Sequence, residues 1–144
     1  MASQHPARRT EWATRLAPDL DVFEALASEA LASLPADLLA RCGTIQISLA
    51  DYADETVLDT MGIEDPYDLL GLFEGTGLAE GGGETMTGQM PNRIWLYRRA
   101  ILDYWAAHEE TLGDLVAHVL IHEIGHHFGL SDADMEAIEA AADL

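Results

Sequence analysis

The sequence contains no lysine, only one cysteine (Cys42), and no long apolar run. A single cysteine cannot form a disulfide within the chain, which excludes a disulfide-stabilised fold and fits the reducing cytoplasm, where we expect this protein. No apolar stretch approaches the roughly 20 residues that a transmembrane helix needs. The amino-terminal arginines precede no apolar segment, so we predict neither a secretory signal nor a membrane span.

Positive charge is also scarce, because the seven basic residues, all arginine, face 26 acids and leave a formal net charge of -19. Such a surface repels nucleic acid and anionic lipid, so we expect neither as a partner. It would attract cationic peptides or metal ions. A solvated acidic surface with no partner at all is the simplest alternative.

What remains is an ordinary globular composition, with 49% apolar residues in 144. A chain of this length is expected to form one domain and can bury a sizeable core. The first 17 residues carry a basic cluster without a core pattern, so we predict a flexible leader over 1–17. A single domain is predicted over 18–144.

Hydrophobic periodicity predicts an α+β domain with a small mixed sheet of about three to four strands and helices at both ends of the chain. The first helix begins after Asp19 as N-cap and ends before Pro35. The predicted strands cover 44–51, 68–75 and 93–97, and shorter helices are predicted over 53–62 and 98–109. A glycine-rich segment over 75–91 is expected to be a mobile loop that borders the functional cleft.

The most informative segment lies near the carboxyl end and reads "HEIGHHFGLSD" over 122–132. Thr111 is expected to start its helix, and Gly129 to end it in a left-handed conformation. Residues four apart point from the same face, about 6 Å apart along the axis. His122 and His126 can therefore offer two imidazoles to one Zn²⁺ ion, and Glu123 beside them can act as general base toward a zinc-activated water.

Two ligands hold zinc weakly, so a third is expected nearby. Gly129 lets the backbone turn back, and Asp132 follows six residues after His126. An oxygen ligand from Asp132 would leave one tetrahedral position for water, as in a catalytic zinc site. The sequence thus predicts a metal site made of His122, His126 and Asp132.

Other histidines in this helix offer alternatives. His118 lies four residues before His122 and could chelate with it, but Val119 follows it, so that pair would lack a base. We expect His118 either behind the ligands or, preferably, in the core wall. His127 should point away from the site and contact the sheet or a helix end. A helix whose histidines are merely hydrogen-bonded in the core would leave the carboxylate of Glu123 unexplained.

These segments resemble the small bacterial zincin-like metallopeptidase family, sometimes called minimal metalloproteases. The resemblance runs from about residue 44 to 135 and is carried by "HEIGHHFGLSDADM", "DPYDLLGLFEG" and "NRIWLYRRAIL". It implies a zincin-like fold, with zinc held by His122, His126 and Asp132 and with Glu123 as base. The long amino-terminal segment and the loop "EGGGETMTGQMP" depart from the commoner pattern of the family.

The resulting expectation is a zinc-dependent metallopeptidase that cleaves a peptide or protein substrate. The alternatives are a metal- or peptide-binding protein with little turnover and a purely structural domain. Met135 is expected in the core, because too few residues follow it to build a methionine-containing turn. Exposed aromatic residues would allow a homodimer. Four side chains could stabilise an oxyanion, and spacing does not choose among them: Tyr67, Arg93, Tyr97 and Tyr104.

Overall fold

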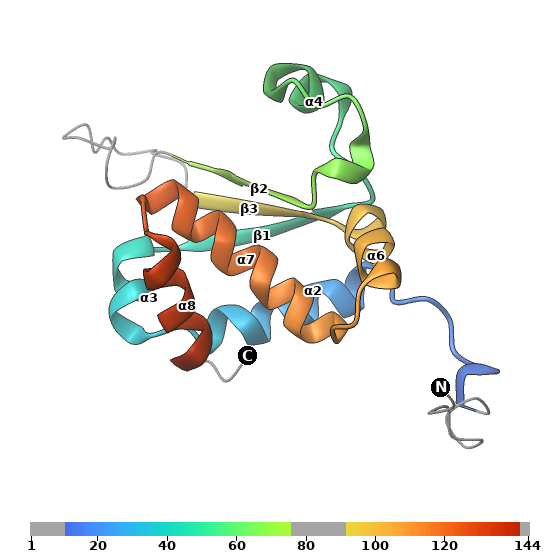
Figure 1. Ribbon diagram of the computed structural model, residues 1–144, viewed down its shortest axis with the longest axis horizontal. Coiled ribbons are helices and arrows are strands. Elements are labelled where there is room, and N and C mark those ends of the chain that lie inside the picture. Colours follow the sequence, from blue (N-terminus) through green and yellow to red (C-terminus); the bar gives the residue numbers. More distant parts are fainter. Residues whose placement is uncertain (1–10, 76–91, 142–144) are drawn as a thin grey trace.

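The computed structural model describes residues 11–75 and 92–141. Within them a three-stranded mixed sheet lies under a layer of helices (Figure 1). The strands are β1 (Ile45–Ala50), β2 (Gly71–Glu74) and β3 (Asn92–Tyr97), in the order β1-β3-β2. β1 runs parallel to β3, and β2 runs antiparallel to it. The predicted α+β class and the small mixed sheet are confirmed.

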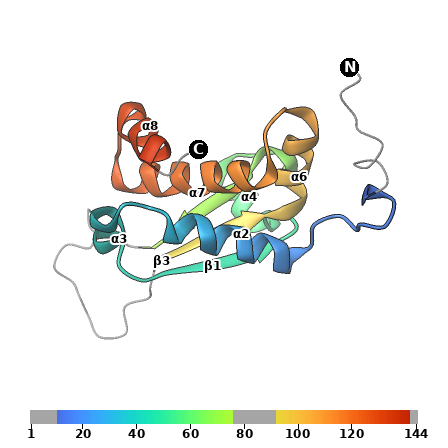
Figure 2. The same cartoon turned by 90° about the horizontal axis from the view of Figure 1, so that it is seen from below.

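The helices are α2 (Leu20–Ala32), α3 (Ala36–Cys42), α4 (Glu55–Met61), α6 (Arg98–Ala107), α7 (Leu112–Phe128) and α8 (Asp132–Ala141). Figure 2 shows α2 and α7 on the same side of β1 and β3. α2 packs on α7 and β1, whereas α7 also contacts β2, β3, α6 and α8. The helix that carries the motif is therefore the central element of the helical layer.

Alternation along β3 explains why one face of the sheet carries the main core. Ile94 and Leu96 are completely buried under the helices. They join fully buried side chains from α2, α6 and α7, namely Phe23, Ile101, Val116, Leu120 and Ile124. Trp95 points to the opposite face, where its ring stacks on Tyr97 at 6.1 Å and its Nε1 donates to Glu74 at 3.1 Å.

Local signals place most element ends as predicted. The Asp19 carboxylate accepts the backbone N–H of Val22 at 3.0 Å and caps α2. α4 ends at Gly62, whose φ of 70° is left-handed as expected. The predicted strand over 68–75 is shorter than expected, because a 3₁₀ turn, η1 (Pro66–Asp68), precedes β2.

One helix was not predicted. Residues after Pro35 form α3, and Cys42 is its last residue. Its thiol is buried, and burial raises the pKa of Cys42. The expected mobile loop over 75–91 lies, apart from Gly75, outside the described residues. None of the described helices combines the length and apolarity that crossing a membrane would require.

Candidate functional site

Helix α7 is anchored at both ends by the residues that the sequence indicated. The Thr111 hydroxyl accepts the backbone N–H of Asp114 at 3.1 Å, and Gly129 ends the helix at a φ of 71°. About half of the residues between them are buried, where α7 packs against the sheet, α2 and α8. The remaining face carries His118, His122 and His126 at four-residue intervals, with Glu123 beside them. An apolar helix thus presents one polar stripe.

His122 and His126 lie on the exposed part of this stripe. The His122 side chain is 50% exposed. The two ring centroids are 6.1 Å apart and the ring planes lie at 79° to each other. Both imidazoles are therefore accessible from outside and stand one helical turn apart, the spacing that two ligands of one ion need.

Glu123 lies deeper, between α7 and the edge strand β2. A Cβ built on Gly71 would lie 3.6 Å from the Cγ of Glu123 and 2.9 Å from Val119 Cγ1, so this glycine allows the helix to approach the strand closely. Burial raises the pKa of Glu123, and this is opposed by nearby His126 and by a hydrogen bond from the Phe73 backbone. A carboxylate held in this way is suited to accept a proton.

Asp132 is the first residue of α8, which folds back along α7. Ser131 and Asp134 form a reciprocal capping box, with the Asp134 N–H donating to the Ser131 hydroxyl at 3.0 Å and the Ser131 N–H donating to the Asp134 carboxylate at 3.2 Å. A small pocket of about 310 Å³ contains Asp132 together with His122, Met135, Glu136 and Glu139. The turn at Gly129 therefore brings Asp132 into the neighbourhood of His122.

The close approach of α8 depends on Gly125 of α7. A Cβ at this position would lie 2.9 Å from Met135 Cγ and would also meet its Sδ. Met135 is 3% exposed, which confirms that it is a core residue.

In the described ranges 11–75 and 92–141, no three His, Cys, Asp or Glu side chains are close enough together to hold a metal ion. The donor set nevertheless fits zinc in kind, with two imidazoles and carboxylates beside one pocket.

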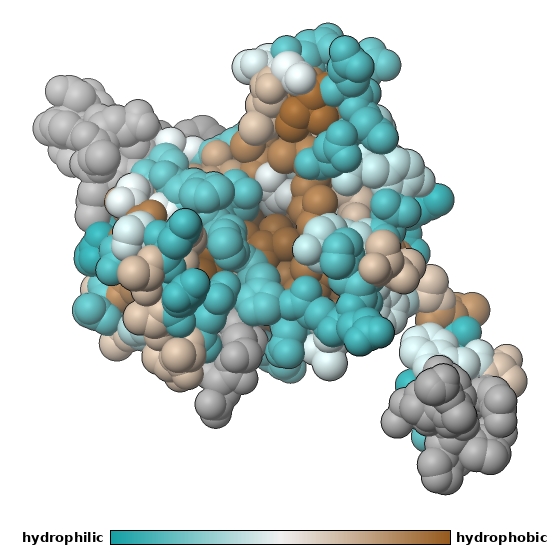
Figure 3. Space-filling model, viewed as in Figure 1, coloured by the Kyte–Doolittle hydropathy of each residue, from teal (hydrophilic) through white to brown (hydrophobic). Residues whose placement is uncertain are grey.

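A larger groove of about 480 Å³ opens beside this pocket. Its apolar lining comes from Leu69, Leu70 and Gly71 and from Leu115 and Val119 of α7. Figure 3 shows an apolar hollow on this face of the molecule, bordered by hydrophilic residues. The polar residues that line the groove are Asp68, Tyr104, Glu110, His118, His122, Glu123 and Glu139. Glu123 and His122 therefore face a cavity that is large enough for side chains of a peptide.

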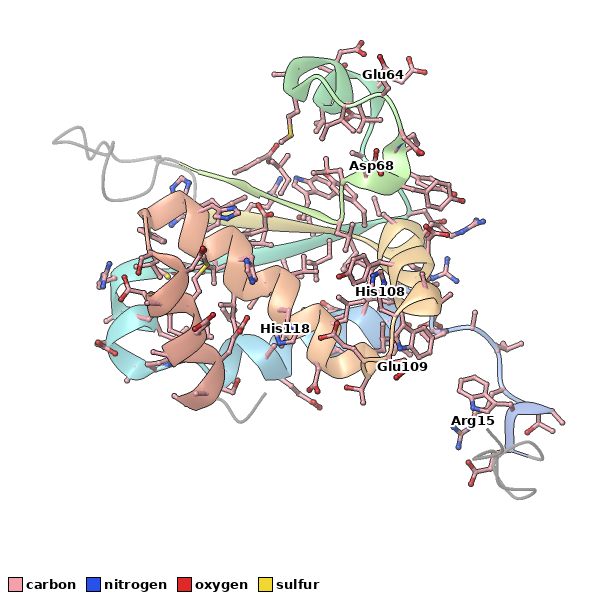
Figure 4. The ribbon with its side chains drawn as sticks, viewed as in Figure 1. Arg15, Glu64, Asp68, His108, Glu109 and His118 are labelled. Atoms are coloured by element: carbon pink, nitrogen blue, oxygen red, sulfur yellow. The ribbon has the colours of Figure 1, made fainter. Side chains whose placement is uncertain are left out.

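We expected His118 preferably in the core wall, but it lies on the wall of this groove. Its Nδ1 forms an ion pair with Glu110, and its Nε2 lies 3.9 Å from Glu139 Oε2. Figure 4 labels His118 on α7. His127 follows the expectation and contacts the sheet, since its ring stacks on Phe73 at 3.9 Å.

Of the four candidates for an oxyanion donor, one lines the groove. Tyr104 is partly exposed there, and the ring of His108 stacks on it at 3.8 Å. The Tyr67 hydroxyl is instead hydrogen-bonded to Tyr52 at 2.8 Å. Arg93 donates to Gln46 at 2.9 Å, and Tyr97 is only 2% exposed.

Two acids near the site were not singled out in the sequence. Glu110 and Glu139 are separated from the motif in the chain and reach it only through packing. The one available signal was that Asp132, Glu136 and Glu139 share a helical face at i, i+4 and i+7.

Comparison with known proteins agrees with this architecture. Residues 42–142 match the sequence model of a family described as "Zincin-like metallopeptidase". A search of curated proteins gives no significant match. The matched region spans β1 to the end of α8 and includes the complete polar stripe of α7. The chain belongs to the zincin-like metallopeptidase family.

Proposed function

We propose that this protein is a zinc-dependent peptidase, with His122, His126 and Asp132 as metal ligands and Glu123 as general base. The observation that carries the proposal is the polar stripe of α7, which presents His122 and Glu123 to a groove in a chain of zincin-like metallopeptidase sequence. A zinc ion bound there would polarise a peptide carbonyl and lower the pKa of the attacking water to about 7.

Other residues of the chain supply the general base and the oxyanion donor. The Glu123 carboxylate accepts the proton of the attacking water and can pass it to the leaving amine. A hydrogen bond from the Phe73 backbone holds it from the strand side, where Gly71 leaves room for the helix to approach. The Tyr104 hydroxyl, on the groove wall, is the candidate donor to the oxyanion.

The substrate that suits the groove is an extended peptide with aliphatic and cationic side chains. The floor at Leu69, Leu70 and Val119 takes the aliphatic part. Asp68 and Glu110 stand on the walls and favour lysine or arginine in the peptide. Within the described residues β2 pairs only with β3, so its other edge can accept a peptide as an added strand.

The experiment is a digest of a peptide library by purified protein loaded with zinc, with and without a chelator. Glu123→Gln preserves the shape of the side chain but cannot accept the proton. We expect this variant to bind zinc like the parent and to lose about 10²-fold or more of the hydrolysis rate. Equal hydrolysis by parent and variant would assign the cleavage to a contaminant or another site.

The second candidate is a metal- or peptide-binding protein with little turnover. It is favoured by one observation, namely that no three potential ligands converge in the described residues. This candidate predicts zinc binding that depends on His126, together with no chelator-sensitive cleavage of any library peptide. His126→Ala with undiminished zinc affinity would count against both candidates.

A further inference from the structure

The segment before α2 carries apolar side chains that the domain does not bury. Of the seven exposed large hydrophobic residues in the described ranges, four lie between Trp12 and Val22. Leu16 is 89% exposed and Trp12 is 48% exposed. Residues 11–17, the leader segment, form one loose turn closed by backbone hydrogen bonds of 3.4 and 3.5 Å. Figure 1 shows this segment leaving the body of the domain beside α6. Clustered apolar side chains in such a position mark an interaction surface.

The groove of about 480 Å³ has the complementary character. Its described lining contains four carboxylates and no arginine, around a floor that includes Leu69 and Val119. Asp68 stands at the rim, next to Leu69, and has no ion-pair partner in the described part of the chain. The groove therefore suits a segment that places an aliphatic side chain beside a basic one.

The leader segment offers this pair of side chains in Arg15 and Leu16. The guanidinium of Arg15 is paired only loosely, at 3.5 Å, with Glu11, and both side chains are more than half exposed. An exposed pair of this kind contributes little free energy, so Arg15 is readily released to another carboxylate. With Leu16 on the apolar floor, Arg15 would reach the rim at Asp68. On a single chain, however, Arg15 and Asp68 lie well apart (Figure 4).

The anchor of the leader segment separates it from the groove of its own chain. Arg98, in the first turn of α6, donates to the Pro18 carbonyl at 2.6 Å. Leu16 is two residues from Pro18 and so stays within about 7 Å of it. Tyr104, where α6 borders the groove, lies six residues beyond Arg98, about 9 Å along the helix axis. The groove of a second chain is free of this restriction.

We propose that the leader segment of one chain docks in the groove of a second copy, with Leu16 on the floor and Arg15 at Asp68. Two copies can exchange their leader segments reciprocally, which gives a closed two-fold dimer. The net charge of -19 on each chain opposes contacts between copies that do not bring an arginine to acids. The docked segment covers the place where a peptide would lie, so the groove is open in the monomer and covered in the dimer.

The test measures the mass of the full chain by analytical ultracentrifugation at low ionic strength, because salt screens exposed ion pairs. The samples are the parent, Arg15→Glu, Asp68→Arg, an equimolar mixture of these two variants, and Arg41→Glu. Arg41 is an exposed arginine of α3 outside the groove and is a matched control for the reversal of one charge. Far-UV circular dichroism establishes that each variant is folded.

We expect the parent and Arg41→Glu to sediment at twice the mass of one chain. Either reversal in the contact should weaken the dimer by about tenfold or more, because like charges then meet at the rim. In the mixture, the reversed leader segment of one protein meets the reversed rim of the other, so dimers should return. A monomeric parent would overturn the proposal, including the case in which the segment docks in its own groove. A dimer that both reversals leave intact, or that the mixture does not restore, would overturn it as well. None of these results depends on zinc or on peptide cleavage.

Discussion

Replacement of Gly125 by alanine tests whether the packing of α8 on α7 is as tight as the structure indicates. The added Cβ would lie 2.9 Å from Met135 Cγ, and Met135 is 3% exposed and cannot move into solvent without leaving the core. Overpacking of this kind costs about 1–3 kcal/mol. Alanine is favoured over glycine in a helix interior by about 1 kcal/mol. The net expectation is a loss of up to about 2 kcal/mol in the free energy of unfolding.

Gly113, in the same helix, is the matched control. A Cβ there would meet only Leu26 Cδ2 at an ordinary 3.8 Å, so Gly113→Ala should be neutral or stabilising by up to about 1 kcal/mol. Urea unfolding followed by circular dichroism measures both variants, since a domain of this size is usually two-state. In a Met135→Ala background, the cost of Gly125→Ala should disappear. A Gly125→Ala protein stabilised as much as Gly113→Ala would refute the tight contact.

Three further predictions concern stability. Burial, and to a smaller extent the nearby acids, raise the pKa of Tyr97 to about 12. The tyrosine of the unfolded chain therefore ionises at lower pH, and the free energy of unfolding should fall by up to about 3 kcal/mol between pH 10 and 12. Tyr97→Phe should remove this decrease in urea unfolding measured across that pH range. Thr111→Ala removes the cap of α7 and should cost about 1 kcal/mol in urea unfolding, whereas an unchanged midpoint would show that the cap is dispensable. Arg98 donates to the Pro18 carbonyl at 2.6 Å and to Asp51 at 3.0 Å, so Arg98→Ala should lower the melting temperature more than Arg15→Ala, since the ion pair of Arg15 with Glu11 is exposed.

The features that were predictable from the sequence are those that depend on neighbouring residues. Asp19 and Thr111 cap helices through side chains that accept hydrogen bonds from backbone N–H groups three residues away. Gly129 ends α7 because a left-handed residue is needed there. The motif itself is also local, since one helix fixes the relation between His122 and Glu123.

The features that were missed depend on packing over longer distances. α3 is only seven residues long and has no side-chain cap, so its pattern was too short to distinguish from a turn. Glu139 lies 17 positions after His122, and its approach depends on the angle at which α8 returns along α7. His118 was expected in the core wall because its pairing with His122 would lack a base, whereas its actual partner, Glu110, precedes the helix.

The strand order has a consequence for how the chain acquires its structure. β3 is the last strand in the sequence but lies in the middle of the sheet, and β1 and β2 have no contact with each other as paired strands. A nascent chain that has left the ribosome only as far as Glu74 therefore has two strands without a partner. Joining β1 to β3 in parallel closes a loop of more than forty residues before their ladder can form, which is entropically costly and slow. We expect folding to wait for synthesis of the Asn92–Tyr97 segment, with the exposed edges of β1 and β2 the most aggregation-prone parts of the incomplete chain until then.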